Sequence, residues 1–321
     1  MTTGELGVVT MAAAPDAVVR AGALAASLRI HEPSIAIALL VLEGLPVPPG
    51  CFDEVLVIRQ PEPFVGPQRF LNKLVHPFRM TPFDRTLFLD DDTLAIRPIR
   101  PVIDEHFAGH AVAINTRVDG PTDPRTGINH LEPSVVCHRF GRAHCLNTNG
   151  GGHMYFEDVA SCRPLVERAI CIATDEFELY RELSSQEICS DELALLIAFN
   201  EAGVEQPALI DFVDALSLRQ ANEIGLDIRR SLYRWNARPW GERIEEVRMV
   251  HLCSSAKRAV PYSREIHNLT GRRQSFDAGG RGVARRATMR LRQGRSSWRF
   301  PGSRGRALSG RGRLGPNTAP R

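Results

Sequence analysis

An apolar segment that runs directly into three consecutive carboxylates is the feature that most constrains this chain. Thr86 to Leu89 has the composition of a buried β-strand, and Asp90, Asp91 and Asp92 follow it without a break. Carboxylates clustered at the end of a buried strand repel one another and resist removal from water. A divalent cation relieves both problems, and oxygen ligands of this kind suit Mg²⁺ or Mn²⁺. We therefore interpret the segment as a metal site at a strand end, with a solvated acidic turn as the alternative.

The order of apolar segments predicts the fold class. A helical pattern over residues 16–30 lies between apolar strands at 6–11 and 35–42, and a third strand is expected at 54–58. Strands that alternate with helices from the start of a chain indicate an α/β fold with a doubly wound, mostly parallel sheet. Ligands bind such sheets at the carboxyl ends of the strands, where Asp90 and Asp92 would lie. Further elements are expected as strands at 111–115, 152–156 and 247–253, helices at 158–172 and 191–200, and a long loop or insertion near the site at 117–148.

Charge divides the chain into two parts. Residues 270–321 hold fourteen arginines against a single acidic residue, Asp277, although the whole chain of 321 residues has a net charge of only +3. A segment rich in Gly, Ser and Arg cannot bury enough apolar surface to fold. We therefore expect one domain over residues 4–265 and a disordered tail over 270–321. The tail could contact polyanions such as nucleic acid or anionic lipid, or it could be an extension without a role.

The cysteines and the N-terminal sequence bear on location. Seven cysteines are scattered without close pairing, and the first residues lack a basic, apolar leader. An odd number of unpaired cysteines is typical of a reducing compartment, so we expect a cytoplasmic protein without a transmembrane segment. Soft metal ligands gather at Cys137, His138, His144, Cys145 and His153, but their spacing matches none of the common zinc patterns, which favours incidental loop residues.

Further motifs follow in a defined order along the chain. They are Lys73-Leu74, Pro82-Phe83-Asp84-Arg85, Asn149-Gly150-Gly151, Ser190-Asp191-Glu192 and the segment from His251 to Lys257. Together with the acidic segment, this set resembles glycosyltransferase family 8, the glycogenin-like enzymes with a GT-A fold, over about residues 5–260. The sequence departs from the family pattern where Ser254 replaces a Gly, where Glu192 replaces a Gln, and where a Pro-Trp pair after Lys257 is absent.

The resemblance implies a metal-dependent transferase that uses a nucleotide-diphosphate sugar, with a UDP-sugar as the family default. It implies that Asp90, Asp92 and His251 bind Mn²⁺ or Mg²⁺ and that Lys257 contacts the diphosphate. An imidazole beside two carboxylates favours Mn²⁺, which accepts nitrogen more readily than Mg²⁺ does. Negative charge on a departing diphosphate is the charge that such an ion stabilises.

Other expected donor contacts come partly from position and partly from the resemblance. Lys73 and Arg85 are basic residues that precede the acidic segment, and Thr10, Met11 and Ala12 end the first strand, where a nucleoside would lie. The resemblance implies that Asn149 and Gly151 line the sugar side of the pocket, and consecutive glycines there permit positive φ and a close approach of the backbone.

Asp191 and Glu192 are the expected catalytic residues. By resemblance Asp191 binds the donor sugar, and Glu192 could be a nucleophile, a base or a solvent-facing residue. The resemblance also implies retention of the donor's anomeric configuration. The sugar and the acceptor cannot be read from the sequence.

Two other functions are weighed against this one. A haloacid-dehalogenase-like phosphatase also places Asp-x-Asp after an apolar strand, but its motif needs Thr or Val where this chain has Leu94, and its Asp lies on the first strand. A catalytically degenerate GT-A module that binds a sugar nucleotide or a partner is the second alternative. Retention of Asp90, Asp92, His251 and Lys257 argues against lost catalysis.

Overall fold

The computed structural model describes residues 5–59, 67–123, 131–148, 152–207, 213–216, 218–235, 247–252 and 254–271. The chain divides into two compact units, Met1–Phe276 and Asp277–Arg321. The second unit and nearly all of the expected tail lie outside the described residues, so the domain limits and the tail stay predictions. Within the described part, no helix has both the length and the apolar character needed to cross a membrane.

A six-stranded sheet forms the centre of the first unit, in the order β3-β2-β1-β4-β9-β6. Its first four strands along the chain are parallel, and β9 then runs antiparallel to both β4 and β6. The strands are β1 (Leu6–Ala12), β2 (Ala36–Leu42), β3 (Glu54–Ile58), β4 (Arg85–Leu89), β6 (Val112–Ala113) and β9 (His153–Phe156). The expected α/β fold with a mostly parallel sheet is confirmed.

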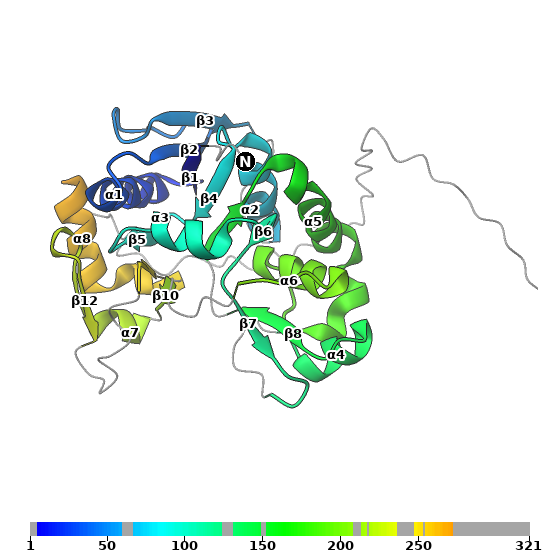
Figure 1. Ribbon diagram of the computed structural model, residues 1–321. Helices are drawn as coiled ribbons and strands as arrows, with labels where there is room; N and C mark the ends of the chain where they lie inside the picture. The colour runs from blue at the N-terminus through cyan, green and yellow to red at the C-terminus, as the bar shows by residue number, and fades with distance from the viewer. Residues whose placement is uncertain are drawn as a thin grey trace, which may run out of the picture. The chain divides into compact units, whose positions relative to one another are not determined.

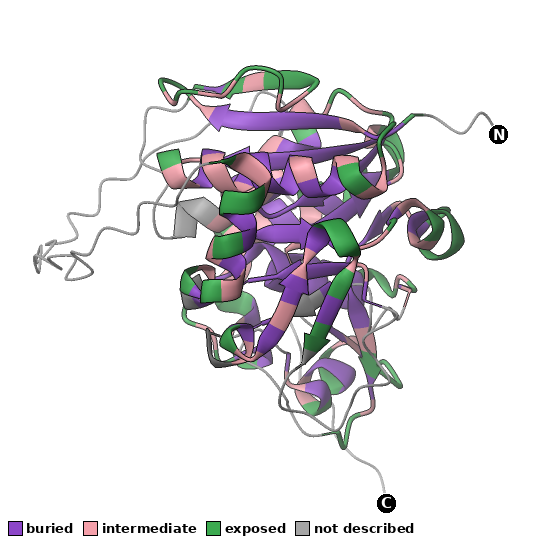
Figure 2. Cartoon of the chain, turned by 90° about the vertical axis from the view of Figure 1, so that its left-hand side faces the viewer, coloured by how far each residue is buried: buried purple, intermediate pink, exposed green. Residues whose placement is uncertain are grey.

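Helices cover both faces of this sheet (Figure 1). Alternate residues of a strand point to opposite faces. Val8 of β1 therefore packs with Leu24 and Leu28 of α1 (Pro15–His31), whereas Val9 packs with residues of the helices on the other face. Those helices are α2 (Pro67–Met80), α5 (Val159–Cys171) and α6 (Asp191–Ala202). Figure 2 shows the inner strands as buried, and the exposed large apolar side chains of this sheet are Val55 and Val57 on the edge strand β3.

A second sheet of three strands has the order β10-β13-β5. Its strands are β10 (Val213–Ala215), β13 (Met249–His251) and β5 (Thr93–Ala95), and β5 begins directly after the acidic segment. A hairpin of β11 (Ile224–Asp227) and β12 (Leu232–Trp235) lies beside the C-terminal helix α8 (Val260–Thr270). The short helices α3 (Arg100–Val102) and α7 (Leu218–Asn222) and a 3₁₀ turn over Ser254–Arg258 connect these elements.

The long loop expected at 117–148 is wrong for the part that the structure describes. That part contains β7 (Thr116–Asp119), α4 (Pro133–Phe140) and β8 (Cys145–Thr148), with β7 and β8 paired as an antiparallel ladder. The helix was hidden from the sequence pattern because Pro133 stands in its first turn, where proline is tolerated, and because the helix is short. Polar residues on a two-stranded ladder likewise give little alternation to read.

The helix expected at 191–200 is confirmed as α6, together with its end signals. Ser190 caps its start, where the side-chain hydroxyl accepts a hydrogen bond from the Leu193 backbone N–H at 3.1 Å. Gly203 ends it in the left-handed conformation with φ +68°. This well-defined start fixes the position of Asp191 and Glu192 at the N-terminal end of a rigid helix.

Candidate functional site

Backbone hydrogen bonds bring the acidic segment, β9 and β13 together. The Asp90 N–H donates to the Gly152 carbonyl at 2.7 Å, and the Leu252 N–H donates to the Asp92 carbonyl at 3.0 Å. In the antiparallel pairing of β5 with β13, Thr93 lies opposite His251. Residues separated by about 160 positions in the sequence therefore meet because two sheets join at the end of β4.

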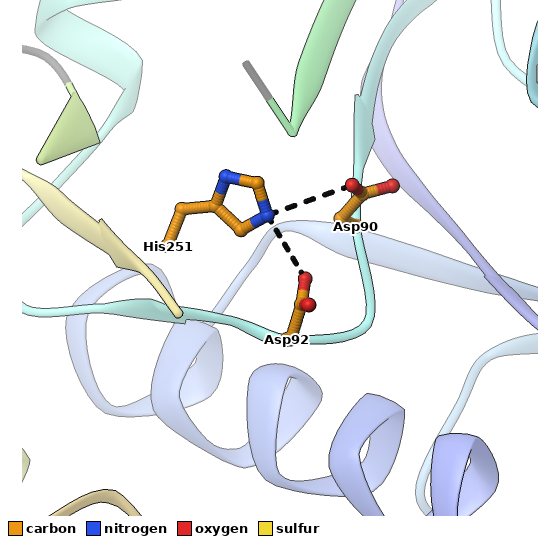
Figure 3. Close-up of side chains that lie close together, drawn as sticks. All are labelled: Asp90, Asp92 and His251. Carbon is orange, nitrogen blue, oxygen red and sulfur yellow. Dashed lines mark ion pairs between the residues drawn. The ribbon is translucent and has the colours of Figure 1, made fainter. Parts of the chain in front are cut away.

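Asp90, Asp92 and His251 form a compact group at this junction (Figure 3). The His251 Nε2 atom lies 3.1 Å from Asp92 Oδ1 and 3.6 Å from Asp90 Oδ2. One ligand atom from each residue fits within 4.8 Å of the others, and all three side chains are buried. Among the described residues, no other set of three His, Cys, Asp or Glu side chains meets this distance. The expected ligands are therefore brought together.

The donor set fits a divalent cation. Two carboxylate oxygens and one imidazole nitrogen face a common point, and the backbone of three separate elements holds them there. Oxygen ligands with a single nitrogen suit Mn²⁺, which is less strict than Mg²⁺ about all-oxygen coordination. A buried position strengthens the attraction between the ion and the carboxylates.

Gly152 makes room for the imidazole. It has φ +91°, and a Cβ atom placed on it would lie 2.6 Å from His251 Nδ1 and 2.7 Å from Cε1. Only glycine therefore permits this backbone conformation and this position of His251 together. The expected positive φ is confirmed at Gly152, and the close contact there is with His251, so an approach of this backbone to a ligand stays a prediction. Asn149 and Gly151 lie outside the described residues, so their role beside the sugar stays a prediction.

Each of the three consecutive carboxylates has its own cation. The pairs are Lys73 Nζ with Asp90 Oδ2 at 2.6 Å, Arg20 Nε with Asp91 Oδ2 at 2.7 Å, and Lys257 Nζ with Asp92 Oδ2 at 2.7 Å. The cations come from α2, α1 and the turn after β13. This one-to-one pairing explains how the protein keeps three neighbouring carboxylates in a largely buried place. The expected basic residues Lys73 and Lys257 are both brought to the site.

The charges within the cluster are fixed by these neighbours. Burial alone would raise the pKa of Asp92, but His251 and Lys257 outweigh it and hold the pKa below its usual value. Burial alone would lower the pKa of Lys73, but the carboxylates of Asp90 and Asp191 outweigh burial and raise it above its usual value. The ammonium therefore stays charged. For Asp91 burial prevails over Arg20, and the pKa of that carboxyl is raised.

Asp191 and Glu192 begin α6 and are both buried. Burial raises the pKa of Asp191, Asp90 adds to the rise, and Lys73 opposes it. Asp191 therefore lies within the electrostatic field of the candidate metal centre. The solvent-facing alternative for Glu192 is wrong, because only 9% of the residue is exposed.

The end of β1 lies beside the acidic cluster. Thr10 pairs in register with Leu89, the residue directly before Asp90. Thr10, Met11 and Ala12 are all buried, so their contact with a nucleoside stays a prediction. Arg85 is not brought to the site. It stands at the opposite end of β4, where its guanidinium donates to the Tyr155 hydroxyl at 2.9 Å and to Asp104 at 3.0 Å.

Two residues at the site were missed by the sequence reasoning. Arg20 of α1 pairs with Asp91, and Tyr262 of α8 is fully buried, with its pKa raised by burial and by Asp92. A third carboxylate in the acidic segment signals that a third cation is needed. Nothing in the sequence distinguishes Arg20 from the many other arginines, because the contact depends on how α1 packs.

Replacing Arg20 with Met should destabilise the protein by about 3 kcal/mol, because Asp91 would keep a buried carboxylate without a partner. Arg20 and Asp91 expose only 12% and 17% of their side chains. Chemical denaturation measures the effect. The double change Arg20→Met and Asp91→Asn should recover much of the loss, since it removes the uncompensated charge as well. Equal stability of the single variant and the wild type would contradict this role for the pair.

The cysteines and histidines considered as zinc ligands do not form a cluster among the described residues. Cys137 lies on α4, Cys145 on β8, and His153 on β9, where its ring stacks on Phe107. Burial raises the pKa of the Cys145 thiol to about 12, which keeps it protonated. His153 lies close enough to the candidate metal centre for His251 to add to burial in lowering its pKa, to about 3.

Comparison with known proteins finds no matching family model and no matching curated protein. Among solved structures, the apo structure of the bifunctional glycosyltransferase WbbM aligns with a TM-score of 0.51 and 11% identity, over 84% of this chain and 50% of that one. This chain therefore spans about half the length of WbbM. The galactosyltransferase LgtC in complex with donor and acceptor sugar analogues aligns with a TM-score of 0.49 and 15% identity, over 82% of this chain and 95% of that one. An active-site mutant of LgtC gives a TM-score of 0.48.

The alignment with WbbM shows a shared fold. Together with the sheet order and the helices on both faces, it confirms the expectation of a GT-A-type fold.

Proposed function

We propose that this protein is a metal-dependent glycosyltransferase that moves a sugar from a nucleoside-diphosphate donor to an acceptor. The observation that carries the proposal is the group of Asp90, Asp92 and His251 at the carboxyl end of β4, flanked by Lys73 and Lys257. Ligands of parallel sheets bind at this edge. Two carboxylates, an imidazole and two ammonium groups together match the needs of a metal-bound diphosphate.

Asp90, Asp92 and His251 would hold Mn²⁺, or Mg²⁺ in its place. When bound, the ion supplies positive charge that stabilises the diphosphate as it leaves the sugar. The protein contributes ligands that are already oriented. His251 is kept in place by the Thr93 pairing and by the space at Gly152, and Asp92 stays ionised because its pKa is lowered.

Lys73 and Lys257 contact the same carboxylates that would bind the ion. A cation and these ammonium groups compete for the same oxygens, so metal alone would bind weakly. A diphosphate offers both lysines a new partner, because each ammonium is a mobile point charge with three donors. Metal and nucleotide would therefore strengthen each other's binding, with the lysines moving from the carboxylates to the phosphates.

The remaining donor contacts follow from the positions around the metal centre. Thr10, Met11 and Ala12 at the end of β1 would contact the nucleoside, with uridine as the proposed base. Asp191 is buried near Lys73 and would accept hydrogen bonds from the sugar hydroxyls. We keep Asn149 and Gly151 as proposed contacts on the sugar side.

We propose retention of the anomeric configuration. In that reaction the leaving phosphate oxygen takes the acceptor's proton on the same face of the sugar, and Asp191 and Glu192 stabilise the positive charge at the anomeric carbon. Glu192 is buried at the start of α6 and is the residue that could instead act as nucleophile or base.

The test is a panel of sugar nucleotides incubated with the protein and Mn²⁺. We expect release of a nucleoside diphosphate from at least one donor, most of all a UDP-sugar, and loss of release in excess chelator. Proton NMR of the first product should then show the α configuration from an α-linked donor. Release that continues undiminished in chelator would contradict the metal-dependent mechanism. A β-linked product would reject retention and point to Glu192, or another carboxylate, as the base.

The same panel separates this proposal from the two alternatives. A degenerate GT-A module would bind a sugar nucleotide without turnover. A phosphatase would release inorganic phosphate, and the GT-A-type fold, in which Asp90 follows the fourth strand, favours the transferase over that enzyme class. A cytoplasmic location and contacts of the basic tail with polyanions stay predictions.

A further inference from the structure

An open groove of about 640 Å³ lies between the β11–β12 hairpin and one face of α8. Its volume falls within the range of roughly 300–1,000 Å³ that is usual for small-molecule sites. Its lining comes from the end of α7 (Asn222), from the hairpin (Ile224, Gly225, Leu226, Asp227, Leu232 and Arg234) and from α8 (Val260, Pro261, Arg264, Glu265 and Asn268).

The groove is separate from the candidate metal centre. Residues 261, 264, 265 and 268 recur at helical spacing and line the groove. Tyr262 and Ile266, which are fully buried, belong to the opposite face of α8, which packs on α1. It is this opposite face that reaches the acidic cluster, through Tyr262. A ligand in the groove would therefore not contact the metal ligands.

Hydrogen bonds within the groove wall hold its polar side chains in place. Glu265 is the buried anchor, and its carboxylate accepts from the Ile228 N–H at 3.2 Å and from Asn268 Nδ2 at 3.0 Å. The Arg264 guanidinium donates to the Leu226 carbonyl at 3.1 Å. These bonds join α8 to the hairpin, so the two walls of the groove form one rigid unit.

A glycine lets the Arg234 side chain lie against the backbone of the hairpin at the groove. Gly225 lies opposite Arg234 in the hairpin, and a Cβ placed on Gly225 would come within 3.0 Å of the Arg234 side chain. The rim carries exposed apolar side chains, with Val260 exposed by 72% and Leu232 by 39%. The groove therefore combines planar polar groups with an apolar platform.

The balance of charge indicates the class of ligand. An anion would meet the carboxylates of Asp227 and Glu265, and a cation would meet the guanidinium groups of Arg234 and Arg264. A hydroxyl group both donates and accepts, so it can use the carboxylates, the guanidinium groups and the two amides of the groove at once. The apolar rim suits the C–H faces of a pyranose ring. We propose that the groove binds an uncharged oligosaccharide, independently of the metal centre.

The test uses saturation-transfer NMR and calorimetry with maltotriose, cellotriose, mannotriose and triacetylchitotriose, in chelator and without nucleotide. We expect at least one probe to bind with a dissociation constant on the order of 1 mM or below. Arg234→Met should weaken that binding about tenfold through the loss of charged hydrogen bonds. Gly225→Leu should weaken it at least as much, because the new side chain would collide with Arg234 and displace its guanidinium. Arg229→Met is the matched control, because Arg229 is exposed on the same hairpin but does not line the groove.

Several outcomes would overturn the proposal. They are a lack of binding by all four probes, undiminished binding in both groove variants, or an equal loss in Arg229→Met. Competition by inorganic phosphate would show an anion site instead. Asp92→Asn should bind the probes as the wild type does, which separates a failure here from a failure of the proposed transferase activity. If Arg234→Met unfolds at the same temperature as the wild type, its loss of probe binding is not caused by a loss of folded protein.

Discussion

Asp92→Asn should reduce metal-dependent turnover by a factor on the order of 100 or more, in line with the loss of electrostatic leaving-group stabilisation. Asp92 offers one oxygen toward His251 and the other to Lys257 at 2.7 Å, so the amide would weaken both the metal site and its cation network. Mn²⁺ affinity should fall as well. Steady-state release of nucleoside diphosphate and Mn²⁺ titration with UDP present are the two measurements.

Asp84→Asn is the matched control for this change. Asp84 is exposed in the turn before β4, six residues before Asp90, and the same substitution there removes one negative charge outside the site. We expect it to behave as the wild type. Full activity of Asp92→Asn, or equal losses in the two variants, would contradict the assignment of Asp92 to the metal.

Gly152→Ala should weaken Mn²⁺ binding by about 10- to 100-fold, the range that is typical when the surroundings that orient a metal ligand are changed. A methyl group on Gly152 would collide with the His251 ring at 2.6 Å, so the imidazole or the backbone must move. The backbone cannot move freely, because the Gly152 carbonyl accepts the Asp90 N–H. Mn²⁺ titration measures the effect.

Gly109→Ala separates the collision from the cost of the backbone conformation. Gly109 has φ +89°, almost the same as Gly152, but a Cβ there would meet no atom within 4 Å. Both variants should lose about 1–2 kcal/mol of stability, because a side chain disfavours positive φ. Only Gly152→Ala should lose metal affinity, and a similar loss in Gly109→Ala would show that the effect is one of general stability.

The sequence predicted the parts of the fold that depend on strongly apolar segments. The strands that became β1, β2, β3 and β4 are rich in apolar residues, and the helix at 191–200 has a capping serine and a terminal glycine. The hairpin of β11 and β12, and helices α2 and α8, were not predicted. Proline within α2 and in the first turn of α8 interrupts their patterns, and the helices are held by packing rather than by local propensity.

The sequence also predicted the group of Asp90, Asp92 and His251, because the order of its motifs matches a family pattern. Such a pattern identifies residues but does not show which side chains contact one another. It could not predict which cation serves each carboxylate. Arg20 reaches Asp91 because α1 packs beside β5, and Arg85, the nearer residue in sequence, points to the far end of its strand. Residues that are close in sequence can be far apart in the structure when they lie at the two ends of one extended strand, as Arg85 and Asp91 do.

Anomalous X-ray scattering from crystals grown with Mn²⁺ and UDP tests the central claim most directly, because it locates the ion without assuming its ligands. We expect one manganese peak bound by Asp90, Asp92 and His251, with the UDP diphosphate beside it and with Lys257 moved from Asp92 to a phosphate oxygen. A well-occupied UDP site with no manganese at these three residues, or manganese bound elsewhere beside the diphosphate, would contradict it.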